Sequence, residues 1–292
     1  MAAQPFDDRD GWVWLDGKFV PHRDAKLHVL THALHYASAV FEGERAYDGV
    51  IFKGHEHSER LHLSARILGF SIPTSAEEID RAKQELIAKQ GLENCYLRAI
   101  AWRGSAQMGV AADRDDVHLA ITSWAWGDYF ADKMKGVRLM IAPWRRPPPD
   151  CAPSNSKAAG LYMICTLARH AANDAGFDDA MMFDWRGQIA EGTGANIFFV
   201  RDGVLHTPYP DCFLNGLTRQ TVIALARQRG IEVVERAIFP NELPTFTEGF
   251  LTGSAAEITP IREIAGLAFK PSTMTEQLMH DFAALTRRKN TA

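Results

Sequence analysis

The chain has 292 residues, of which 46% are hydrophobic and 23% charged, and its formal net charge is -4. This length and apolar content predict one large or two modest domains with well-formed cores. The slightly acidic balance excludes a strongly basic nucleic-acid-binding surface as the default. No apolar run approaches the ~18 residues of a membrane span, and residues 1–11 lack the apolar stretch that a signal peptide needs.

The first part of the chain is predicted to be a sheet with helices. Asp16-Gly17 joins two strand-like runs, 12–15 and 18–20, in a hairpin. The stretch 37–47 is predicted to be extended, and Asp48-Gly49 then turns the chain.

Two helices follow, one over 55–69 and one that begins with the capping box Ser75-Ala76-Glu77-Glu78 and ends at Gly91. Runs rich in β-branched and aromatic residues at 95–102 and 117–126 predict two further strands. Together these elements predict a small N-terminal domain that consists of a sheet and two helices.

A polar segment, 128–136, is predicted to connect this N-terminal domain, 1–127, to a larger C-terminal domain, 137–292. The elements expected in the larger domain are strands at 137–142, 180–183, 197–200, 204–206, 232–236 and 249–252, and helices at 160–175, 218–230 and from about 272. Hairpins outnumber strand–helix–strand units, which favours an α+β fold over a doubly wound parallel sheet.

The cysteines at positions 95, 151, 165 and 212 are far apart and form no Cys-x-x-Cys pair. In a chain of this size, such spacing indicates free thiols in a reducing compartment. We therefore expect a cytoplasmic protein in which the thiols are structural.

Lys157 and Glu191 are the strongest chemical candidates. A lysine amine can form a Schiff base with a carbonyl cofactor, and a buried carboxylate can hold a ring nitrogen protonated. The small residues 158–160 leave room for a packed cofactor beside Lys157, and Tyr162 can hydrogen-bond a ring hydroxyl. This combination predicts pyridoxal phosphate (PLP) chemistry, although a surface lysine and a turn acid fit the bare sequence too.

A phosphate group needs backbone N–H donors and a cation. The segment 215–219 opens a helix after Gly216, so that Leu217 and Thr218 are expected to direct N–H groups at an anion. A second small-residue turn at 253–257 offers the Ser254 hydroxyl. Spacing alone does not identify the residue that supplies the cation, because the sequence around Arg60 is also typical of a surface arginine.

Three histidines, His28, His32 and His35, stand at i, i+4 and i+7 and would share one face of a helix. This spacing raises the hypothesis of a zinc site. No Glu-x-x-His pattern accompanies them, and their neighbours fit a strand or a turn equally well. We therefore predict no metal.

Taken together, the motifs resemble the branched-chain aminotransferases, in the fold-type IV group of PLP enzymes, over nearly the whole chain. The matching segments are 32–36, 40–43, 59–62, 96–98, 108–110, 156–160, 191–196, 216–219 and 253–260. The resemblance implies an α+β fold similar to D-amino acid aminotransferase, with a smaller N-terminal α/β sandwich and a larger C-terminal sheet-and-helix domain. It also implies ping-pong transamination of leucine, isoleucine and valine with 2-oxoglutarate or glutamate.

The resemblance implies a role for each matching residue of the cofactor site. Lys157 matches the Schiff-base lysine that also transfers the proton, Glu191 the partner of the pyridine nitrogen, and Tyr162 the partner of the ring hydroxyl. The residues that match the phosphate site are Arg60, Leu217, Thr218 and Ser254.

The substrate carboxylate is implied to bind the backbone N–H groups of Ala255 and Ala256, helped by Tyr96 and Arg98. Glutamate must also bind, and it carries a second carboxylate. Arg98 or a backbone donor would therefore have to bind that carboxylate as well. The side-chain pocket is implied to be walled by Tyr36, Phe41, Gly43, Met108, Gly109, Val110 and Tyr129. In the family the 108–110 segment reaches into a neighbouring subunit's site, which implies a homodimer or a larger homo-oligomer.

Glu44 stands where the family often has an apolar residue. If it faces the pocket, it would favour a cationic or amine substrate; if it points outward, it has no bearing on specificity. Within the same fold group, a D-amino acid or (R)-amine transaminase is the alternative, followed by aminodeoxychorismate lyase. A metal protein and a catalytically silent binding module are the alternatives outside this group.

Overall fold

The computed structural model describes residues 4–127 and 133–287, and the chain divides into two compact units. Unit 1 consists of Met1–Gly127 and Ser156–Gly160, and unit 2 of Asp128–Asn155 and Leu161–Ala292. Lys157 therefore belongs to unit 1, although the chain on either side of its segment belongs to unit 2. Both units combine a sheet with helices, which confirms the predicted α+β class.

Unit 1 is built on an antiparallel sheet with the strand order β2-β1-β7-β6-β4-β5, in which β3 also pairs with β6. The strands are β1 (Trp12–Leu15), β2 (Lys18–Pro21), β3 (Ala39–Phe41), β4 (Glu44–Tyr47), β5 (Val50–Ile51), β6 (Cys95–Arg103) and β7 (Val117–Ala125), and the helices are α1 (His32–Tyr36), α2 (Gly54–Ile67) and α3 (Ala76–Gln90), with a 3₁₀ turn η1 (His22–Asp24).

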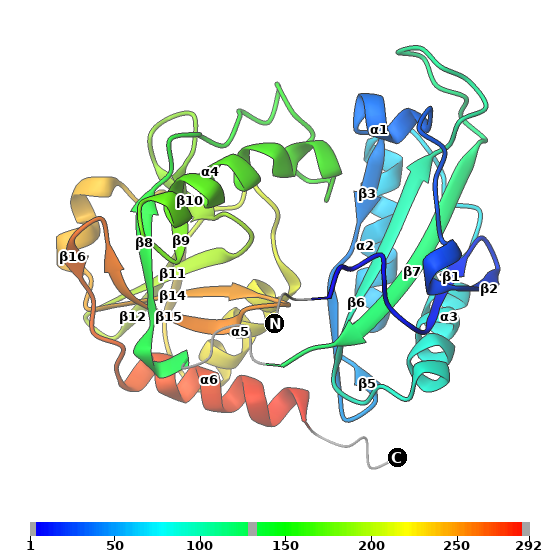
Figure 1. Cartoon of the computed structure of the whole chain (residues 1–292). Helices are drawn as coiled ribbons and strands as arrows, with labels where there is room; N and C mark the ends of the chain where they lie inside the picture. The colour runs from blue at the N-terminus through cyan, green and yellow to red at the C-terminus, as the bar shows by residue number, and fades with distance from the viewer. Residues whose placement is uncertain (1–3, 128–132, 288–292) are drawn as a thin grey trace. The chain divides into compact units, whose positions relative to one another are not determined.

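The helices α2 and α3 cover one face of this sheet (Figure 1). Leu61 of α2 and Leu86 of α3 are fully buried against Ala99 and Ile121 of the sheet. The predicted capping box is present, because Ser75 accepts a hydrogen bond from the Glu78 N–H while the Glu78 carboxylate accepts one from the Ser75 N–H. The opposite face of the sheet carries Tyr96 and Arg98, two of the predicted substrate residues.

The stretch 37–47, predicted to be extended, is less regular than expected. A five-residue helix, α1, ends just before it, and Ala37 adopts φ +54°. Glu42 and Gly43 then separate β3 from β4. Phe41, before this interruption, lies against Lys157, whereas Glu42, within it, pairs with Arg60 of α2.

Unit 2 contains a nine-stranded mixed sheet. Its strands are β8 (Val137–Ile141), β9 (Asp179–Phe183), β10 (Ile189–Gly192), β11 (Asn196–Arg201), β12 (Val204–Pro208), β13 (Val233–Arg236), β14 (Glu248–Gly253), β15 (Glu257–Ile264) and β16 (Leu267–Ala268). Its helices are α4 (Met163–Asp174), α5 (Leu217–Gln228) and α6 (Thr273–Thr286), with 3₁₀ turns η2 (Lys133–Lys135), η3 (Ala159–Tyr162, which begins in unit 1) and η4 (Pro240–Thr245).

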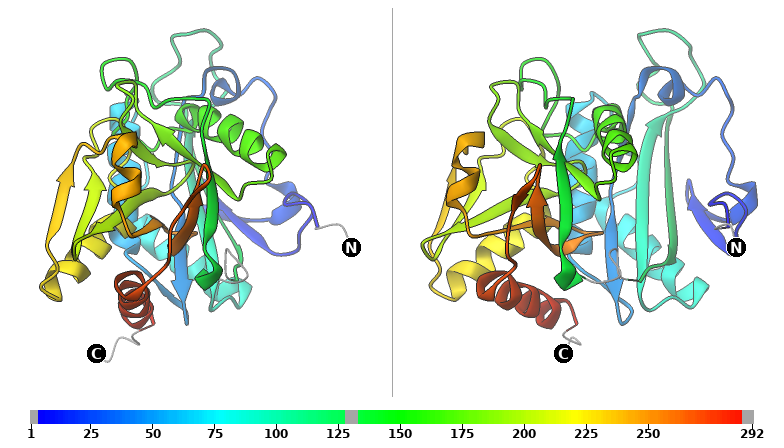
Figure 2. Two further views of the ribbon diagram at one scale, coloured as in Figure 1. Left: turned by 90° about the vertical axis from the view of Figure 1, so that its left-hand side faces the viewer. Right: turned by 60° about the vertical axis from the view of Figure 1, so that its left-hand side comes forward.

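Six strands of unit 2 close into a ring in the order β10-β9-β8-β15-β14-β11, because β10 also pairs with β11. An apolar cluster that includes Leu139, Phe199, Leu251 and Ile261 fills this ring. Helix α4 packs on β8 and β9, whereas α5 and α6 pack on each other beside β14 (Figure 2). Strands β10, β15 and β16 were not predicted. No helix of the described chain is long and apolar enough to cross a membrane.

Candidate active site

Lys157 lies beside β3 in unit 1. Its carbonyl oxygen accepts a hydrogen bond from the Phe41 N–H at 3.1 Å, and its own N–H donates to Ser64 Oγ at 3.0 Å. Ala158 forms an antiparallel bridge with Val40. The Lys157 Nζ lies 4.9 Å from the centre of the Phe41 ring. The backbone is thus anchored on both sides of the amine-bearing residue, and the amine lies against a predicted pocket residue.

Tyr96, Arg98 and Gly43 form a group with Phe41. Arg98 Nη2 donates to Tyr96 Oη at 3.1 Å, and the Arg98 guanidinium lies 4.6 Å from the Phe41 ring centre. A Cβ at Gly43 would collide with the Tyr96 hydroxyl and lie 2.9 Å from Tyr96 Cζ, so glycine is required here. Unit 1 therefore brings these four predicted residues together with Lys157.

Arg45 is a second cation on this face that sequence reasoning missed. It is paired in register with Tyr96, and cross-strand partners of an antiparallel pair lie on the same face of the sheet. Arg45 is only 5% exposed, and its guanidinium lies 5.0 Å from the Tyr47 ring centre. The sequence did hold a signal for it, because alternation along the predicted extended stretch 37–47 places residue 45 on the face opposite Glu44.

Glu44 faces neither the predicted pocket nor solvent. It is paired in register with Leu97, which packs on the helix-covered face of the sheet. Lys83 Nζ donates to Glu44 Oε2 at 2.8 Å and to Ser58 Oγ at 2.7 Å, and both charged groups are almost fully buried. Burial raises the pKa of Glu44 in spite of the neighbouring Lys83. Glu44 is therefore a structural residue with no contact to the Tyr96 face.

Arg60 forms an ion pair with Glu42. Its Nε and Nη2 donate to the two Glu42 oxygens, both at 2.7 Å, and His57 Nδ1 lies 2.6 Å from Glu42 Oε2. Glu42 has no exposed surface. Burial favours its neutral form, but Arg60 and His57 outweigh burial and hold the pKa of Glu42 well below its usual range. The predicted phosphate cation thus has a fixed orientation on α2.

Tyr36 and the 108–110 segment are connected through His32 in unit 1. The Tyr36 ring stacks on His32 with centres 4.6 Å apart, and His32 Nε2 lies 2.8 Å from the Gly109 carbonyl oxygen. Met108 is 41% exposed and Val110 85% exposed. Tyr129, the remaining predicted pocket residue, lies outside the described residues.

The histidine hypothesis of a zinc site is wrong for the described chain. His28 Nδ1 accepts from the Leu30 N–H at 3.1 Å, and His35 Nε2 lies 2.9 Å from the Val29 carbonyl oxygen. Among the described residues, potential metal ligands converge within 4.8 Å in one group, and it contains no histidine.

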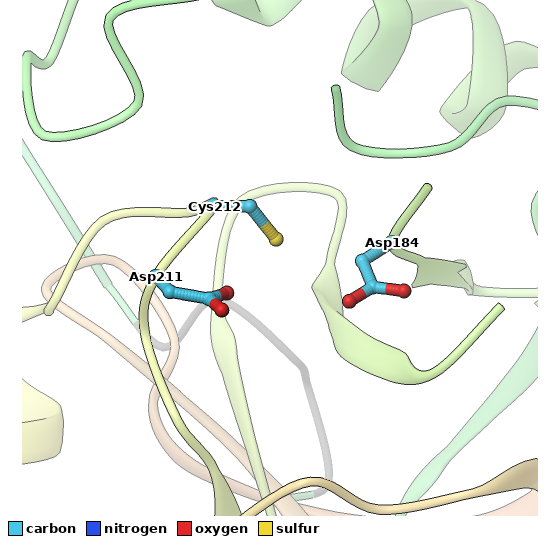
Figure 3. Close-up of side chains that lie close together, drawn as sticks. All are labelled: Asp184, Asp211 and Cys212. Atoms are coloured by element: carbon cyan, nitrogen blue, oxygen red, sulfur yellow. The ribbon is translucent and has the colours of Figure 1, made fainter. Parts of the chain in front are cut away.

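That group consists of Asp184, Asp211 and Cys212, whose side chains point toward one another (Figure 3). Arg186 Nη2 lies 2.7 Å from Asp184 Oδ2 and 2.8 Å from Asp211 Oδ2. Burial and the Asp211 charge raise the pKa of the Cys212 thiol to about 12. One guanidinium thus bridges both carboxylates, and the raised pKa disfavours the thiolate that a metal would need, so we assign no metal here.

Glu191 is the centre of the predicted residues in unit 2. Arg146 Nε donates to Glu191 Oε1 at 2.6 Å, and Asn196 Nδ2 donates to Glu191 Oε2 at 3.2 Å. All three residues are buried. Burial lowers the pKa of Arg146, but the Glu191 charge outweighs burial and raises it above its ordinary value. The acid therefore has an ionised partner on one side and an amide donor on the other.

Asn196 also connects Glu191 to the start of α5. The two residues are register partners where β10 meets β11, and Asn196 Oδ1 accepts from the Gly216 N–H at 3.1 Å. A Cβ at Gly216 would collide with this oxygen. Leu217 and Thr218 form the first turn of α5, where N–H groups have no acceptor within the helix. Neither Asn196 nor Arg146 was singled out from the sequence.

The residues Ser254, Ala255 and Ala256 form the turn between β14 and β15. Gly253 pairs with Glu257 across this hairpin, and Thr252 pairs with Asn196 on the neighbouring strand. The turn thus lies at the same edge of the sheet as Glu191 and the start of α5. Tyr162, at the end of η3, packs on the apolar cluster between α4 and the sheet.

Comparison with known proteins assigns the chain to a family. The sequence profile of the amino-transferase class IV family matches residues 39–264, so the chain belongs to this family. It is 40% identical to the branched-chain-amino-acid aminotransferase of Pseudomonas aeruginosa, over 98% of this chain and 96% of that protein. It is 38% identical to the branched-chain-amino-acid aminotransferase of Escherichia coli K12, over 88% and 85% of the two chains.

Solved structures of aminotransferases support the same family assignment. The branched-chain aminotransferase of Thermoproteus uzoniensis with norvaline superposes with a TM-score of 0.93 at 36% identity, covering 97% of both chains. An aminotransferase from Brucella abortus bound to the cofactor PLP gives a TM-score of 0.89 at 29% identity, covering 96% of this chain and 100% of that chain. These similarities confirm the resemblance inferred from the motifs and the fold expected from it.

Proposed function

We propose that the chain is a PLP-dependent transaminase of branched-chain L-amino acids, which exchanges the amino group of leucine, isoleucine or valine with 2-oxoglutarate. The similarity to aminotransferases of this substrate class over nearly the full chain supports this function. The observation that carries the proposal is the buried Glu191, held between Arg146 and Asn196. A carboxylate kept charged in a buried site is suited to pair with a protonated ring nitrogen.

Each unit carries residues that we assign to PLP. Lys157 supplies an amine with a fixed backbone, and Glu191 an ionised acid. The first turn of α5 offers the N–H groups of Leu217 and Thr218 to a phosphate, as helix N-termini commonly do. We assign the remaining phosphate contacts to Arg60 and Ser254, and the ring hydroxyl to Tyr162. When bound, PLP supplies an electron-withdrawing ring and a carbonyl carbon for the amino group.

The residues of the chain then position the substrate and move the proton. Lys157 Nζ would take up the proton from the substrate α-carbon and act as the base that holds and releases it. Arg98, oriented by its hydrogen bond to Tyr96, and the N–H groups of Ala255 and Ala256 hold the substrate carboxylate. Fixing the carboxylate orients the α-carbon toward the lysine, which is the positioning effect that raises the rate.

The pocket favours branched aliphatic side chains. We assign its walls to Tyr36, Phe41, Gly43, Met108, Val110 and Tyr129. Each buried methylene group contributes about 0.8 kcal/mol to binding in such a pocket. Arg45, buried on the Tyr96 face, offers a second cation for the distal carboxylate of glutamate, so that Arg98 need not serve twice.

We propose that the active form is a homodimer or a larger homo-oligomer in which the 108–110 segment serves a neighbouring copy. The exposure of Val110, at 85%, supports this, because a large apolar side chain at the tip of a loop gains by burial against a partner. The cytoplasmic location expected from the cysteines remains a prediction.

Two measurements test the function together. Borohydride reduction of the purified holoenzyme, followed by peptide mass spectrometry, should place the cofactor on Lys157. Formation of the corresponding 2-oxo acids from L-leucine, L-isoleucine and L-valine in the presence of 2-oxoglutarate should be detected, while D-alanine and (R)-1-phenylethylamine should react poorly. Cofactor on another lysine, or preference for the D-amino acid or the amine, would refute the proposal.

A further inference from the structure

The buried histidine of α1 has no role in the chemistry described so far. His32 is 2% exposed, unlike His28 and His35, which lie on the surface. A buried imidazole needs partners for both ring nitrogens. His32 has them, since Nδ1 lies 2.5 Å from Ser38 Oγ and Nε2 lies 2.8 Å from the Gly109 carbonyl oxygen.

The two partners define the tautomer of the neutral ring. A carbonyl oxygen can only accept, so Nε2 of His32 carries the hydrogen that is donated to Gly109. In the neutral ring, Nδ1 then accepts from the Ser38 hydroxyl. The imidazole is therefore held from one side and donates from the other, which fixes the distance between α1 and the Gly109 backbone.

Gly109 lies in the loop between β6 and β7. Apart from the bond to His32, the hydrogen bonds found for the described residues of this loop lie near its base. At the base, the Gly104 N–H donates to the Asp116 carbonyl oxygen at 2.8 Å, and the Ala106 N–H donates to Asp116 Oδ2 at 2.7 Å. Within the described chain, the His32 bond is the one hydrogen bond that reaches residues 107–112. Gly109 adopts φ +138°, which other residues rarely adopt, so the tip has a specific shape to preserve.

His32 also contacts a second predicted wall of the pocket. Its ring stacks on Tyr36 one helical turn further on, with centres 4.6 Å apart and planes inclined by 30°. One side chain thus connects Tyr36 to the backbone between Met108 and Val110. The backbone N–H of His32 adds a bond of 2.7 Å to the Gly104 carbonyl oxygen at the base of the same loop.

We propose that His32 is a positioning residue for substrate specificity, which holds the 108–110 tip in the arrangement that contacts branched side chains. The inference rests on the proposed function of Met108 and Val110 as pocket walls. Without the bond, the tip must be ordered each time a substrate binds, and that entropic cost weakens binding. Leucine, recognised through its apolar branch, loses more than glutamate, which is recognised through its second carboxylate.

The test compares His32→Leu, which removes the donor but keeps an apolar side chain of similar bulk, with His32→Gln, whose amide can still donate to Gly109. For the holoenzymes we expect the KM for L-leucine to rise about three- to tenfold in His32→Leu, the range of one lost hydrogen bond. The kcat and the KM for L-glutamate should change less than about twofold, and His32→Gln should recover most of the loss. His35→Gln, at an exposed histidine of the same helix, is the matched control.

Hydrogen exchange supplies a readout that does not depend on catalysis. Amides 107–112 should exchange faster in His32→Leu than in the wild type, while those of β6 and β7 stay unchanged. Ser38→Ala, a milder change on the other side of the ring, should move exchange and KM in the same direction by less, and it serves if His32→Leu does not fold.

The outcomes distinguish the proposed role of His32 from the proposed function of the enzyme. Unchanged exchange at the tip, or a loosened tip with both KM values unchanged, would overturn the role of His32. An equal rise of the KM for leucine and glutamate would also overturn it, because a general loss of structure would then explain the effect. A wild-type enzyme that is inactive on leucine would instead refute the proposed function itself.

Discussion

Nε of Arg146 lies 2.6 Å from Oε1 of Glu191, although the two residues are 45 positions apart in the chain. Both are buried, and Arg146 Nη1 also donates to the Leu161 carbonyl oxygen at 3.1 Å. A ring nitrogen that pairs with Glu191 therefore meets a carboxylate whose charge is already stabilised. The pair keeps the acid ionised and fixes its position within the sheet of unit 2.

Replacing Arg146 tests this relationship in the apo protein. Arg146→Met leaves Glu191 buried without its counter-charge, and removal of one partner of a buried pair costs about 3–5 kcal/mol. The double variant Arg146→Met, Glu191→Gln should recover much of this loss, because no uncompensated charge remains. Urea unfolding of the apo forms measures both. A double variant as unstable as the single one would show that Arg146 acts through packing alone.

Gly43→Ala is expected to impair substrate binding selectively. The added methyl group collides with the Tyr96 hydroxyl, and Tyr96 has little room to move because it packs on Trp124 and Trp126 with ring centres 5.0 and 5.1 Å away. Arg98 then loses its orienting bond. We expect kcat/KM for leucine to fall about ten- to a hundredfold, as small misplacements of positioning groups do.

The visible spectrum of the bound cofactor should stay unchanged in Gly43→Ala. Gly127→Ala is the matched control, because a Cβ at that position meets nothing within 4 Å. A loss of activity in both variants, or a loss of cofactor in Gly43→Ala, would argue against the assigned contact with Tyr96.

The pair of Lys83 and Glu44 should be structural and not catalytic. Lys83→Met leaves Glu44 buried and unpaired, at a cost of about 3–5 kcal/mol of unfolding free energy. The double variant Lys83→Met, Glu44→Met should be close to the wild type, since well-packed apolar groups often replace buried ion pairs without loss. Arg81→Met, on the exposed side of the same helix, serves as control.

Substrate preference decides the role of Glu44. If the folded double variant keeps the leucine preference of the wild type, Glu44 has no part in specificity. A shift of the double variant toward or away from amines would place Glu44 in the pocket and contradict the structural assignment.

Glu42 should make the stability of the protein depend on pH. Its pKa lies below the ordinary value of about 4.3 in the folded state, so on acidification the unfolded chain binds a proton there first. The stabilisation by Glu42 is therefore full above about pH 4.3 and is lost as the pH falls toward the folded-state pKa.

The measurement is urea unfolding between pH 7 and pH 3.5. Glu42→Gln should be less stable than the wild type at pH 7, and the difference should narrow as the pH falls below about 4.3. Curves that stay parallel through this range would mean that Glu42 does not titrate with a lowered pKa.

Local signals predicted much of the fold. The Asp16-Gly17 hairpin and the Ser75 capping box appear where the sequence placed them, because turn and cap geometry depends on a few adjacent residues. Strand β15 was missed because its first residues follow a small-residue turn and lack a clear alternation. Helix α1 was missed because five residues are too few for a periodic pattern.

Only the site residues that stand in sequence motifs could be predicted. Lys157 and Glu191 stand in recognisable segments, but Arg146, the charged partner of Glu191, does not. Arg146 reaches Glu191 across 45 positions, and Lys83 reaches Glu44 across 39. No local spacing encodes such pairs, because they arise when the sheet brings distant segments together.

The most direct test of the central claim is the visible spectrum of the holoenzyme mixed rapidly with L-leucine and then with 2-oxoglutarate. A yellow protein should lose its colour on addition of L-leucine and regain it with 2-oxoglutarate, and Lys157→Ala should do neither at a comparable rate. A protein that is colourless with added PLP, or that responds to D-alanine or (R)-1-phenylethylamine but not to L-leucine, would contradict a branched-chain transaminase built around Lys157.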